Sequence, residues 1–250
     1  KLGVGGGASR FPCRDSKALD VALSRAAVPA LQVHARPYLA NFHEPFVLLS
    51  TGTWCISLNP FNHQPLTMDE LKQDSLCYLN YRGTPVKASR LFAGYEHEQQ
   101  TKRIAAHFGK GSSSFKSIKY DSSIIEDLKQ RNSESLKFAE RDLSDFANET
   151  EAYHQLILDL VEQQVPSTEM VIQQTGVKRI FVDGGFGNND IFMHLMANKF
   201  ESEEIFAASM AQATAVGTAI AIHKHWNSKA LSGNIIELRF YPRSEAVSSD

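Results

Sequence analysis

The sequence predicts an α/β fold, because segments with strand character alternate with segments of helical periodicity along its 250 residues. Two apolar runs, 46–50 and 54–58, flank a tight turn and are expected to pair as strands. A third apolar run, 180–182, ends in a glycine turn that leads into a helical pattern. Residues 121–174 between them are mainly helical in pattern, so the sheet is expected to carry helical insertions.

Composition excludes several classes of protein. The chain has 26 basic and 28 acidic residues, a net charge of −2, and therefore no electrostatic signature of nucleic-acid binding. No run of about 18 apolar residues exists, which excludes a membrane span of the usual kind. The chain begins with Lys1 rather than Met and has no signal-peptide pattern, so we expect a piece of a longer protein.

Cysteine usage predicts a reducing compartment. The three cysteines are odd in number and form no CxxC pair, which is typical of free thiols in the cytoplasm: Cys13, Cys55 and Cys77.

The first half of the chain alternates short strands with helices. Val47, Leu49, Trp54 and Ile56 are the expected wall residues of the first two strands. Two helices are predicted first, 16–33, which is interrupted at Pro29, and 66–73, which is capped by Thr67. A hairpin 76–88 around Arg82-Gly83, an amphipathic helix 89–108 and a loop 109–117 are expected after them.

The second half contains longer helices and short strands. A helix over 148–165 is expected to begin near Asn148 or Thr150, and another near Asn188 or Asn189. The remaining predictions are a strand 202–208, a buried small-residue helix 210–226 and a last edge strand 235–242.

The turn Ser50-Thr51-Gly52-Thr53 has three hydroxyls around a single glycine. Small residues let backbone N–H groups approach an anion, and hydroxyls add donors, so the turn is suited to hold phosphate without a Walker lysine. The alternative is a plain hairpin turn whose hydroxyls satisfy nearby backbone groups.

The stretch "VDGGFGNND", 182–190, has the layout strand, glycine turn, helix. Gly184 and Gly185 follow the strand, and Asn188 stands near the start of the helix, a layout that presents N–H groups and a positive dipole end to a nucleotide. The alternative is a tight turn with an asparagine cap. Asp183 could contact ribose or Mg²⁺-bound water, or only hold the turn. The glycines of 3–9 follow no strand, so we assign them no nucleotide role.

Three stretches in order carry a resemblance: "STGTW" at 50–54, "VDGGFGNNDIFMHLMANKF" at 182–200 and "AASMAQATAVGTAIAIH" at 207–223. Together they resemble the C-terminal half of the FGGY family of carbohydrate kinases, over roughly residues 40–240. The resemblance implies an actin-like, ribonuclease-H-like ATPase fold. It implies that Ser50, Thr51, Gly52 and Thr53 approach ATP phosphates, and that Gly184, Gly185 and Asn188 frame adenosine. It also implies that Gln99, in a helix that approaches ATP, contacts the nucleotide.

The implied activity is Mg²⁺- and ATP-dependent phosphorylation of a sugar, a ketose or deoxy-ketose such as rhamnulose, fuculose or xylulose. Trp54 after the turn is similar to the rhamnulokinase branch. Residues 41–250 would form the ATP-binding domain, 1–40 an atypical stretch, and the sugar-binding half is not found in this chain. A homodimer is included among the expected partners, and the sequence leaves the oligomeric state open. The alternatives are a non-catalytic domain that binds nucleotide or a partner, and another member of the actin-like superfamily.

The resemblance also implies a general base upstream of the hydroxyl turn. Asp15 in "CRDSKAL" is our candidate, although its spacing to Thr53 is longer than in the family and Ala30 stands at the expected position. Asp20 is a poorer candidate, and Asp15 could instead cap the helix near Ser16.

No metal site is predicted, since His223 and His225 are better explained as helix-end residues. Arg90 and Lys87 either line the sugar side or are solvated.

Overall fold

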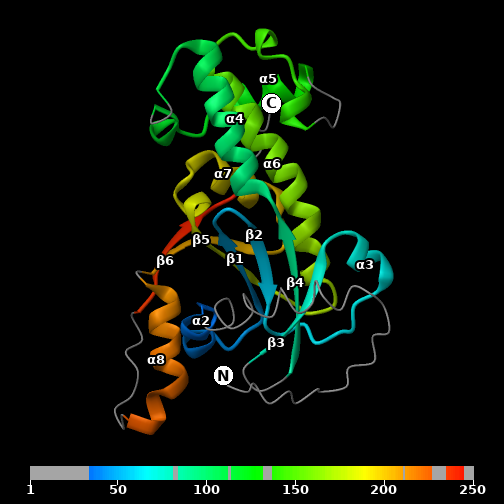
Figure 1. Ribbon diagram of the computed structural model, residues 1–250, viewed down its shortest axis with the longest axis vertical. Coiled ribbons are helices and arrows are strands. Elements are labelled where there is room, and N and C mark those ends of the chain that lie inside the picture. Colours follow the sequence, from blue (N-terminus) through cyan, green and yellow to red (C-terminus); the bar gives the residue numbers. More distant parts are fainter. Residues whose placement is uncertain are drawn as a thin grey trace, which may run out of the picture.

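A computed structural model describes residues 34–80, 84–111, 114–131, 137–210, 212–226 and 235–244. In this part of the chain seven strands form one mixed sheet in the order β3-β4-β2-β1-β5-β6-β7 (Figure 1). The strands are β1 (Phe46–Thr51), β2 (Cys55–Asn59), β3 (Ser75–Leu79), β4 (Pro85–Leu91), β5 (Arg179–Gly184), β6 (Glu204–Ser209) and β7 (Glu237–Tyr241). The predicted α/β class is confirmed, as are the hairpin of β1 with β2, the pairing of β3 with β4, and β7 as an edge strand.

Strand direction gathers several chain segments at one edge of the sheet. β1, β5 and β6 run parallel to one another, and β4 runs with them because both β1 and β4 are antiparallel to β2. Thr51, Leu91, Gly184 and Ser209 therefore end their strands at the same edge, which we call the carboxyl edge. In open α/β sheets this edge is where ligands bind.

Helices α4 (Ala93–Phe108), α6 (Glu149–Ile172) and α7 (Asp190–Lys199) pack together on one face of the sheet. Val47, Leu49 and Val182 of the sheet join Leu156 and Phe192 of the helices in the larger hydrophobic core. The outer ends of α4 and α6 extend beyond the sheet together with α5 (Ser122–Arg131), at the top of Figure 1. Of these, α5 and α6 lie in the stretch 121–174 that was predicted to be mainly helical.

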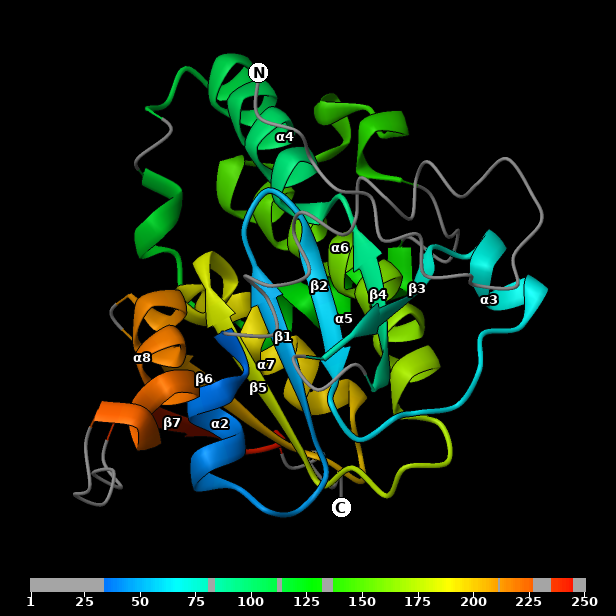
Figure 2. The same ribbon diagram turned by 60° about the horizontal axis from the view of Figure 1, so that its bottom comes forward.

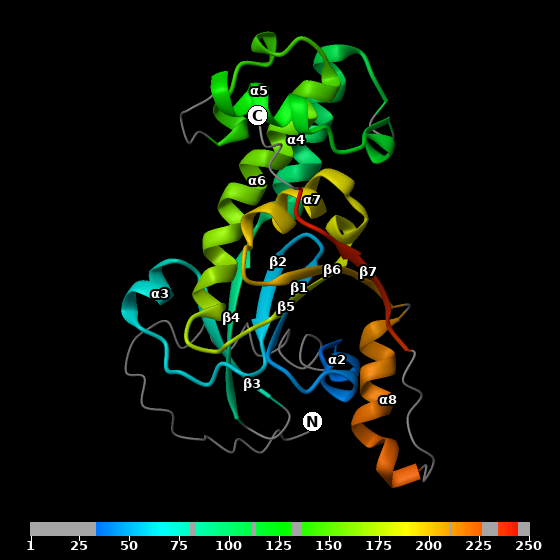
Figure 3. The same ribbon diagram turned by 180° about the vertical axis from the view of Figure 1, so that it is seen from behind.

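The other face of the sheet is covered by α2 (Arg36–Asn41), and α8 (Ala213–Trp226) lies beside α2 (Figure 2). Tyr38 of α2 packs with Phe46, Leu48 and Phe181 of the sheet in a second, smaller core. Figure 3, from behind, shows α8 projecting past the sheet beside β7. None of the helices in the described ranges is long and apolar enough to cross a membrane.

Local sequence explains where the helices begin and end. Thr67 and Glu70 form a reciprocal capping box that starts α3 (Met68–Lys72), as expected for Thr67. Asn148 caps α6 by accepting the N–H of Glu151, and Gly109 ends α4 in the left-handed conformation at φ 65°.

Short 3₁₀ turns complete the helical parts: η1 (Ser114–Ser117), η2 (Phe138–Glu140), η3 (Leu143–Asp145) and η4 (Gly185–Asn188). η1 lies inside the predicted loop 109–117.

Two element predictions need correction, and a third is not tested. Trp54 is not a wall residue: β2 begins at Cys55, and Trp54 is in the turn and 39% exposed. The helix predicted from 89 begins only at Ala93, because Ser89, Arg90 and Leu91 pair with β2 as the end of β4. The helix predicted over 16–33 lies outside the described residues.

Helix α8 forms as predicted, but the prediction that it is buried was wrong. Ala213 and Gly217 are buried, whereas Thr214, Ala215, Thr218 and Ala219 are exposed. The helix packs beside α2 at the margin of the sheet, so among the described residues it contacts protein mainly on the side that faces α2.

Candidate functional site

The hydroxyl turn lies at the carboxyl edge, between β1 and β2. Ser50 is half-buried on β1, opposite Asp183 of β5, and Thr51 is buried. Gly52 and Thr53 are exposed, and the N–H of Gly52 donates to the carbonyl oxygen of Trp54 at 3.0 Å, which closes the turn. The exposed part of the turn is therefore Gly52 and Thr53.

Thr51 connects this turn to the glycine turn that follows β5. Its hydroxyl donates to the carbonyl oxygen of Asp183 at 2.6 Å and accepts the N–H of Phe186 at 3.0 Å. Both hydrogen bonds are buried, so water does not compete with them. The two stretches that the sequence singled out are thus joined through one side chain.

The glycine turn needs glycine at Gly184. Its φ is 96°, and a Cβ there would lie 2.0 Å from the carbonyl oxygen of Thr51. Gly187 is also confined, since its Cβ would lie 2.8 Å from the carbonyl oxygen of Val182. Asn189 then caps α7 by accepting the N–H of Phe192, in agreement with the predicted helix start.

Gly52 and Gly185 are different from these glycines. Neither has a φ in the left-handed region, a Cβ on Gly185 would meet no atom within 4 Å, and one on Gly52 would meet only the carbonyl oxygen of Trp54 at 4.0 Å. The packing of the described residues therefore requires no glycine at these two exposed positions.

Helix α4 holds the other side of the hydroxyl turn. A Cβ on Gly94 would lie 1.7 Å from the carbonyl oxygen of Gly52, and the N–H of Tyr95 donates to the carbonyl oxygen of Thr53 at 3.1 Å. Sequence reasoning missed Gly94. A glycine in the first turn of a helical pattern is the signal that could have found it, because such a glycine often marks close packing.

Behind the glycine turn a polar chain links three helices. Nε2 of His97 lies 2.9 Å from the hydroxyl of Tyr153, which also accepts the side-chain N–H of Asn189 at 2.8 Å. Burial lowers the pKa of His97 to about 4 and raises the pKa of Tyr153 to about 12. Both groups are therefore neutral near pH 7 and position the cap of α7. Neither was singled out from the sequence.

The Asp183 carboxylate faces α2 and not the glycine turn. Its Oδ2 lies 2.6 Å from Nε2 of His34 and 3.2 Å from the hydroxyl of Tyr38. Burial, together with this carboxylate, raises the pKa of Tyr38. It is the backbone carbonyl of Asp183, through Thr51, that holds the glycine turn.

The chain has the fold of one half of a known kinase family. Residues 43–127 match the family model "Carbohydrate kinase FGGY, C-terminal domain". The resemblance to the C-terminal half of the FGGY kinases is thereby confirmed. A search of curated protein sequences gave no significant match.

Solved structures agree on the fold. The chain is similar, with a TM-score of 0.58 in each case, to three solved kinases. A carbohydrate kinase from Novosphingobium aromaticivorans is 18% identical, and the match covers 89% of this chain and 48% of that one. A xylulose kinase from Rhodospirillum rubrum is 12% identical (88% of this chain, 46% of that one), and a ligand-bound xylulose kinase from Lactobacillus acidophilus is 15% identical (87% of this chain, 46% of that one). The predicted actin-like, ribonuclease-H-like fold is thereby confirmed. The chain spans less than half the length of these structures.

A pocket of about 280 Å³ adjoins the glycine turn. It lies between the glycine turn, β6 and β7, and its lining includes Gly187, Asn188, Ser209, Arg239 and Tyr241. Asn188 is exposed here, with its side-chain nitrogen 3.5 Å from the carbonyl oxygen of Gly184. The pocket, the glycine turn and the hydroxyl turn all open at the carboxyl edge.

The other predicted site residues are more scattered. Gln99 is half-buried on α4, and Asp15 and Asp20 lie outside the described residues. Lys87 and Arg90 are neither free nor simply solvated, because they pair with Glu70 at 2.7 Å and Asp74 at 3.1 Å respectively. Within the described ranges, no three His, Cys, Asp or Glu side chains gather in a way that could hold a metal ion.

Proposed function

We propose that this chain is the nucleotide-binding half of an ATP-dependent sugar kinase, and that the whole protein phosphorylates a ketose or deoxy-ketose such as rhamnulose, fuculose or xylulose. The observation that carries the proposal is the bonding of Thr51, which fixes the hydroxyl turn beside the glycine turn at the carboxyl edge. Residues 41–250 form this half, and 1–40 are a stretch that the family pattern does not cover.

The exposed glycines Gly52 and Gly185 are suited to close approach by a nucleotide. Gly52 and Gly185 lack a side chain at exposed positions where the fold alone would accept one. A missing Cβ is useful there if another molecule approaches the backbone closely, as phosphate oxygens do when they accept backbone N–H bonds. The space above both turns is thus the proposed path of the phosphates.

Thr53 is our main candidate for a phosphate-contacting side chain, since it is exposed while the hydroxyl of Thr51 is already engaged. Ser50 would add a donor from the same turn, and Gly52, whose N–H already donates to Trp54, would leave room for the phosphates because it has no Cβ. Gly184, Gly185 and Asn188 would frame adenosine beside the pocket of about 280 Å³. Gln99, on the helix that clamps the turn, would approach the same nucleotide.

Mg²⁺ would arrive with the nucleotide, because this ion is usually held by substrate phosphates and one or two carboxylates and not by a complete protein cage. When bound, it neutralises charge on the phosphates. Asp15 stays our proposed general base, which would accept the proton of the sugar hydroxyl. A cytoplasmic location is consistent with Cys55 and Cys77, which are both free thiols. A homodimer remains a proposal.

Calorimetric titration with Mg·ADP and a non-hydrolysable ATP analogue tests the proposal. Thr53→Val should weaken nucleotide binding by about tenfold, as expected for the loss of one hydrogen bond to a charged group. Thr84→Val is the matched control, because Thr84 stands just before β4 begins, at the opposite edge of the sheet. Equal affinity in all three proteins would contradict the role of the turn.

The rival reading, a non-catalytic domain of the same fold, needs a second assay. Sugar-dependent release of ADP by the chain supports the kinase, whereas nucleotide binding without turnover supports a binding domain.

A further inference from the structure

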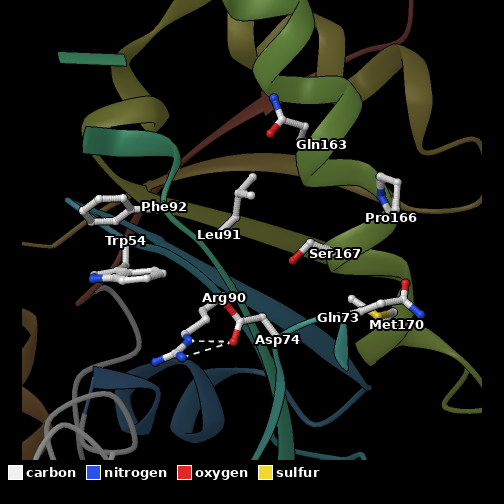
Figure 4. A pocket seen from close by; sticks show the side chains of 10 residues that line it. All are labelled: Trp54, Gln73, Asp74, Arg90, Leu91, Phe92, Gln163, Pro166, Ser167 and Met170. Carbon is white, nitrogen blue, oxygen red and sulfur yellow. Dashed lines mark hydrogen bonds and ion pairs between the residues drawn. The ribbon is translucent and has the colours of Figure 1, made fainter. Parts of the chain in front are cut away.

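Two groups of exposed apolar side chains differ in what covers them. The first lies at the hydroxyl turn beside a pocket of about 400 Å³, where Trp54 and Phe92 lie one above the other (Figure 4). Their ring centroids are 4.4 Å apart, and the Arg90 guanidinium lies 5.0 Å from the centre of the Trp54 ring, so these side chains cover one another. The second group, Leu238 and Phe240, lies on β7 and is 38% and 51% exposed.

Strand β7 is an open edge of the sheet. It is the last strand in the sheet order, and no strand of the described ranges pairs with its outer side. Such an edge presents unpaired backbone N–H and C=O groups, to which another strand can add. Many natural edge strands prevent this addition with a proline or a bulge. Between Glu237 and Tyr241 β7 has neither, because its five residues pair with β6 without interruption.

One face of β7 is apolar. The rings of Phe240 and Phe206 have centroids 5.3 Å apart, and Ile236, just before the strand, packs against the smaller core. Side chains alternate between the faces of a strand, so Ile236, Leu238 and Phe240 lie in one row on the α2 side of the sheet. Exposed apolar residues at an unpaired edge are a mark of an interaction surface.

The other face of β7 has an acid and a base two positions apart. Nη2 of Arg239 lies 3.8 Å from Oδ1 of Asp190, longer than a hydrogen bond, and its side chain is 68% exposed. The guanidinium also lies 4.7 Å from the centre of the Tyr241 ring. Glu237 is exposed and forms no ion pair with any residue that the structure describes. Both charges can therefore meet another molecule.

The spacing of these residues favours one register for pairing β7 with the β7 of a second copy. Opposite residues of an antiparallel pair share a face, so under a two-fold axis each residue meets its own copy or one an even number of positions away. With the axis at Leu238, that residue meets its own copy and Ile236 meets Phe240. Glu237 then meets Arg239 on both sides of the axis. With the axis at Arg239, two like charges would be opposite each other, which is unfavourable.

We propose that two copies of this chain associate through β7, antiparallel and in the register centred on Leu238, so that their two sheets become one continuous sheet. The apolar row and the charges select the same register, which is the argument for a second copy as the partner. The opposite edge strand, β3, carries no charged side chain between Ser75 and Leu79, so no register is favoured there in this way.

This inference specifies the surface of the homodimer proposed above. Association through β7 needs no nucleotide, so it does not rest on the kinase activity. β7 also borders the pocket of about 280 Å³, whose lining includes Glu237, Leu238 and Arg239. The second copy would therefore stand at the rim of that pocket.

Sedimentation velocity over a series of protein concentrations tests the proposal. The wild type should change from monomer to dimer as the concentration rises, and added salt should weaken the dimer because exposed ion pairs are screened. Arg239→Glu and Glu237→Arg should each raise the dissociation constant by about tenfold or more, since symmetry places like charges opposite each other at both ends of the pair. Lys129→Glu, the same charge change as Arg239→Glu but on α5 beyond the sheet, should leave it unchanged.

Mixing the two charge variants separates loss of pairing from loss of fold. An equimolar mixture of Arg239→Glu and Glu237→Arg places opposite charges together again, so a heterodimer should form at concentrations where neither variant associates alone. The double variant with both substitutions exchanges the two charges and should dimerise like the wild type. A variant that had only unfolded would not be restored by mixing.

Three results would overturn the inference: a wild type that stays monomeric at every concentration, a dimer that persists in both single variants, or a mixture that does not associate. Mg·ADP titration of the wild type keeps this inference apart from the proposed function. Nucleotide binding by a protein that stays monomeric defeats only the β7 dimer, and a dimer that binds no nucleotide defeats only the nucleotide site.

Discussion

The hydroxyl of Thr51 donates to the carbonyl oxygen of Asp183 at 2.6 Å, across 132 positions of sequence. The same hydroxyl accepts the N–H of Phe186, so a single side chain sets the spacing between the hydroxyl turn and the glycine turn. A residue that looks like a phosphate ligand in the sequence therefore also has a structural task in the fold.

Thr51→Val should destabilise the protein by about 1–3 kcal/mol, because it leaves a buried carbonyl and a buried N–H without their partner. Urea denaturation measures the change. Thr51→Ser is the matched control, since it keeps the hydroxyl and should recover most of the stability. Thr53→Val should leave stability almost unchanged because Thr53 is exposed; equal losses for both valine variants would contradict this division of roles.

Gly184→Ala and Gly185→Ala should behave oppositely, although they are neighbours. Alanine at 184 would sit at φ 96° and press on the carbonyl oxygen of Thr51, so we expect a loss of about 1–3 kcal/mol or more. Alanine at 185 meets nothing within 4 Å and should be neutral, or stabilise by about 0.4–1 kcal/mol.

Nucleotide affinity should separate the same pair in a second way. Gly185→Ala should lower affinity for Mg·ADP in calorimetry despite its intact stability, because the added methyl occupies the proposed path of the ligand. A Gly185→Ala protein that binds Mg·ADP as tightly as the wild type would count against that path.

Gly94→Ala should displace the hydroxyl turn from the helix side. The added Cβ would lie 1.7 Å from the backbone oxygen of Gly52, and backbone cannot move aside as a flexible side chain can. We expect lower stability in urea together with weaker nucleotide binding. Gly52→Ala is the comparison, since its Cβ meets only one atom at 4.0 Å and the fold should persist; unchanged binding in Gly94→Ala would show that the contact does not set the turn.

Acid should destabilise the protein through His97. Its folded pKa of about 4 is below the usual value near 6.5, so the unfolded chain binds more protons between these values. Stability from this group is complete above about pH 6.5 and falls by about 2–3 kcal/mol as the pH approaches 4.

A comparison of wild type with His97→Gln isolates this effect, because burial also lowers the pKa of His154 and both histidines contribute to the wild-type curve. Unfolding free energies near pH 7 and near pH 5 should differ less in the variant. A difference of the same size in both proteins would assign the acid sensitivity elsewhere.

Local sequence patterns were sufficient for much of the fold. Alternating apolar runs gave β1 and β2, and Thr67, Asn148 and Asn189 marked helix starts because a capping side chain bonds within three residues of its own position. The predictions were wrong where residues far away in the sequence determine the secondary structure. Arg90 has helix-compatible neighbours but pairs with Ile56 of β2, and Trp54 lies in the turn before β2 and not in the strand.

The sequence by itself determined the α/β class, the two turns of small residues and their order, since turn chemistry depends on residues adjacent in the chain. Only the tertiary structure decided which atoms of those turns stay free. The Thr51 hydroxyl is bonded to Asp183 and Phe186, and Gly184 lies against the Thr51 backbone, whereas Thr53 and Gly185 are exposed. Gly94 and His97 enter the site from a helix that no turn pattern marks. The reason is physical: hydrogen bonds and close contacts between segments more than a hundred residues apart depend on strand register, and register forms only when the sheet assembles.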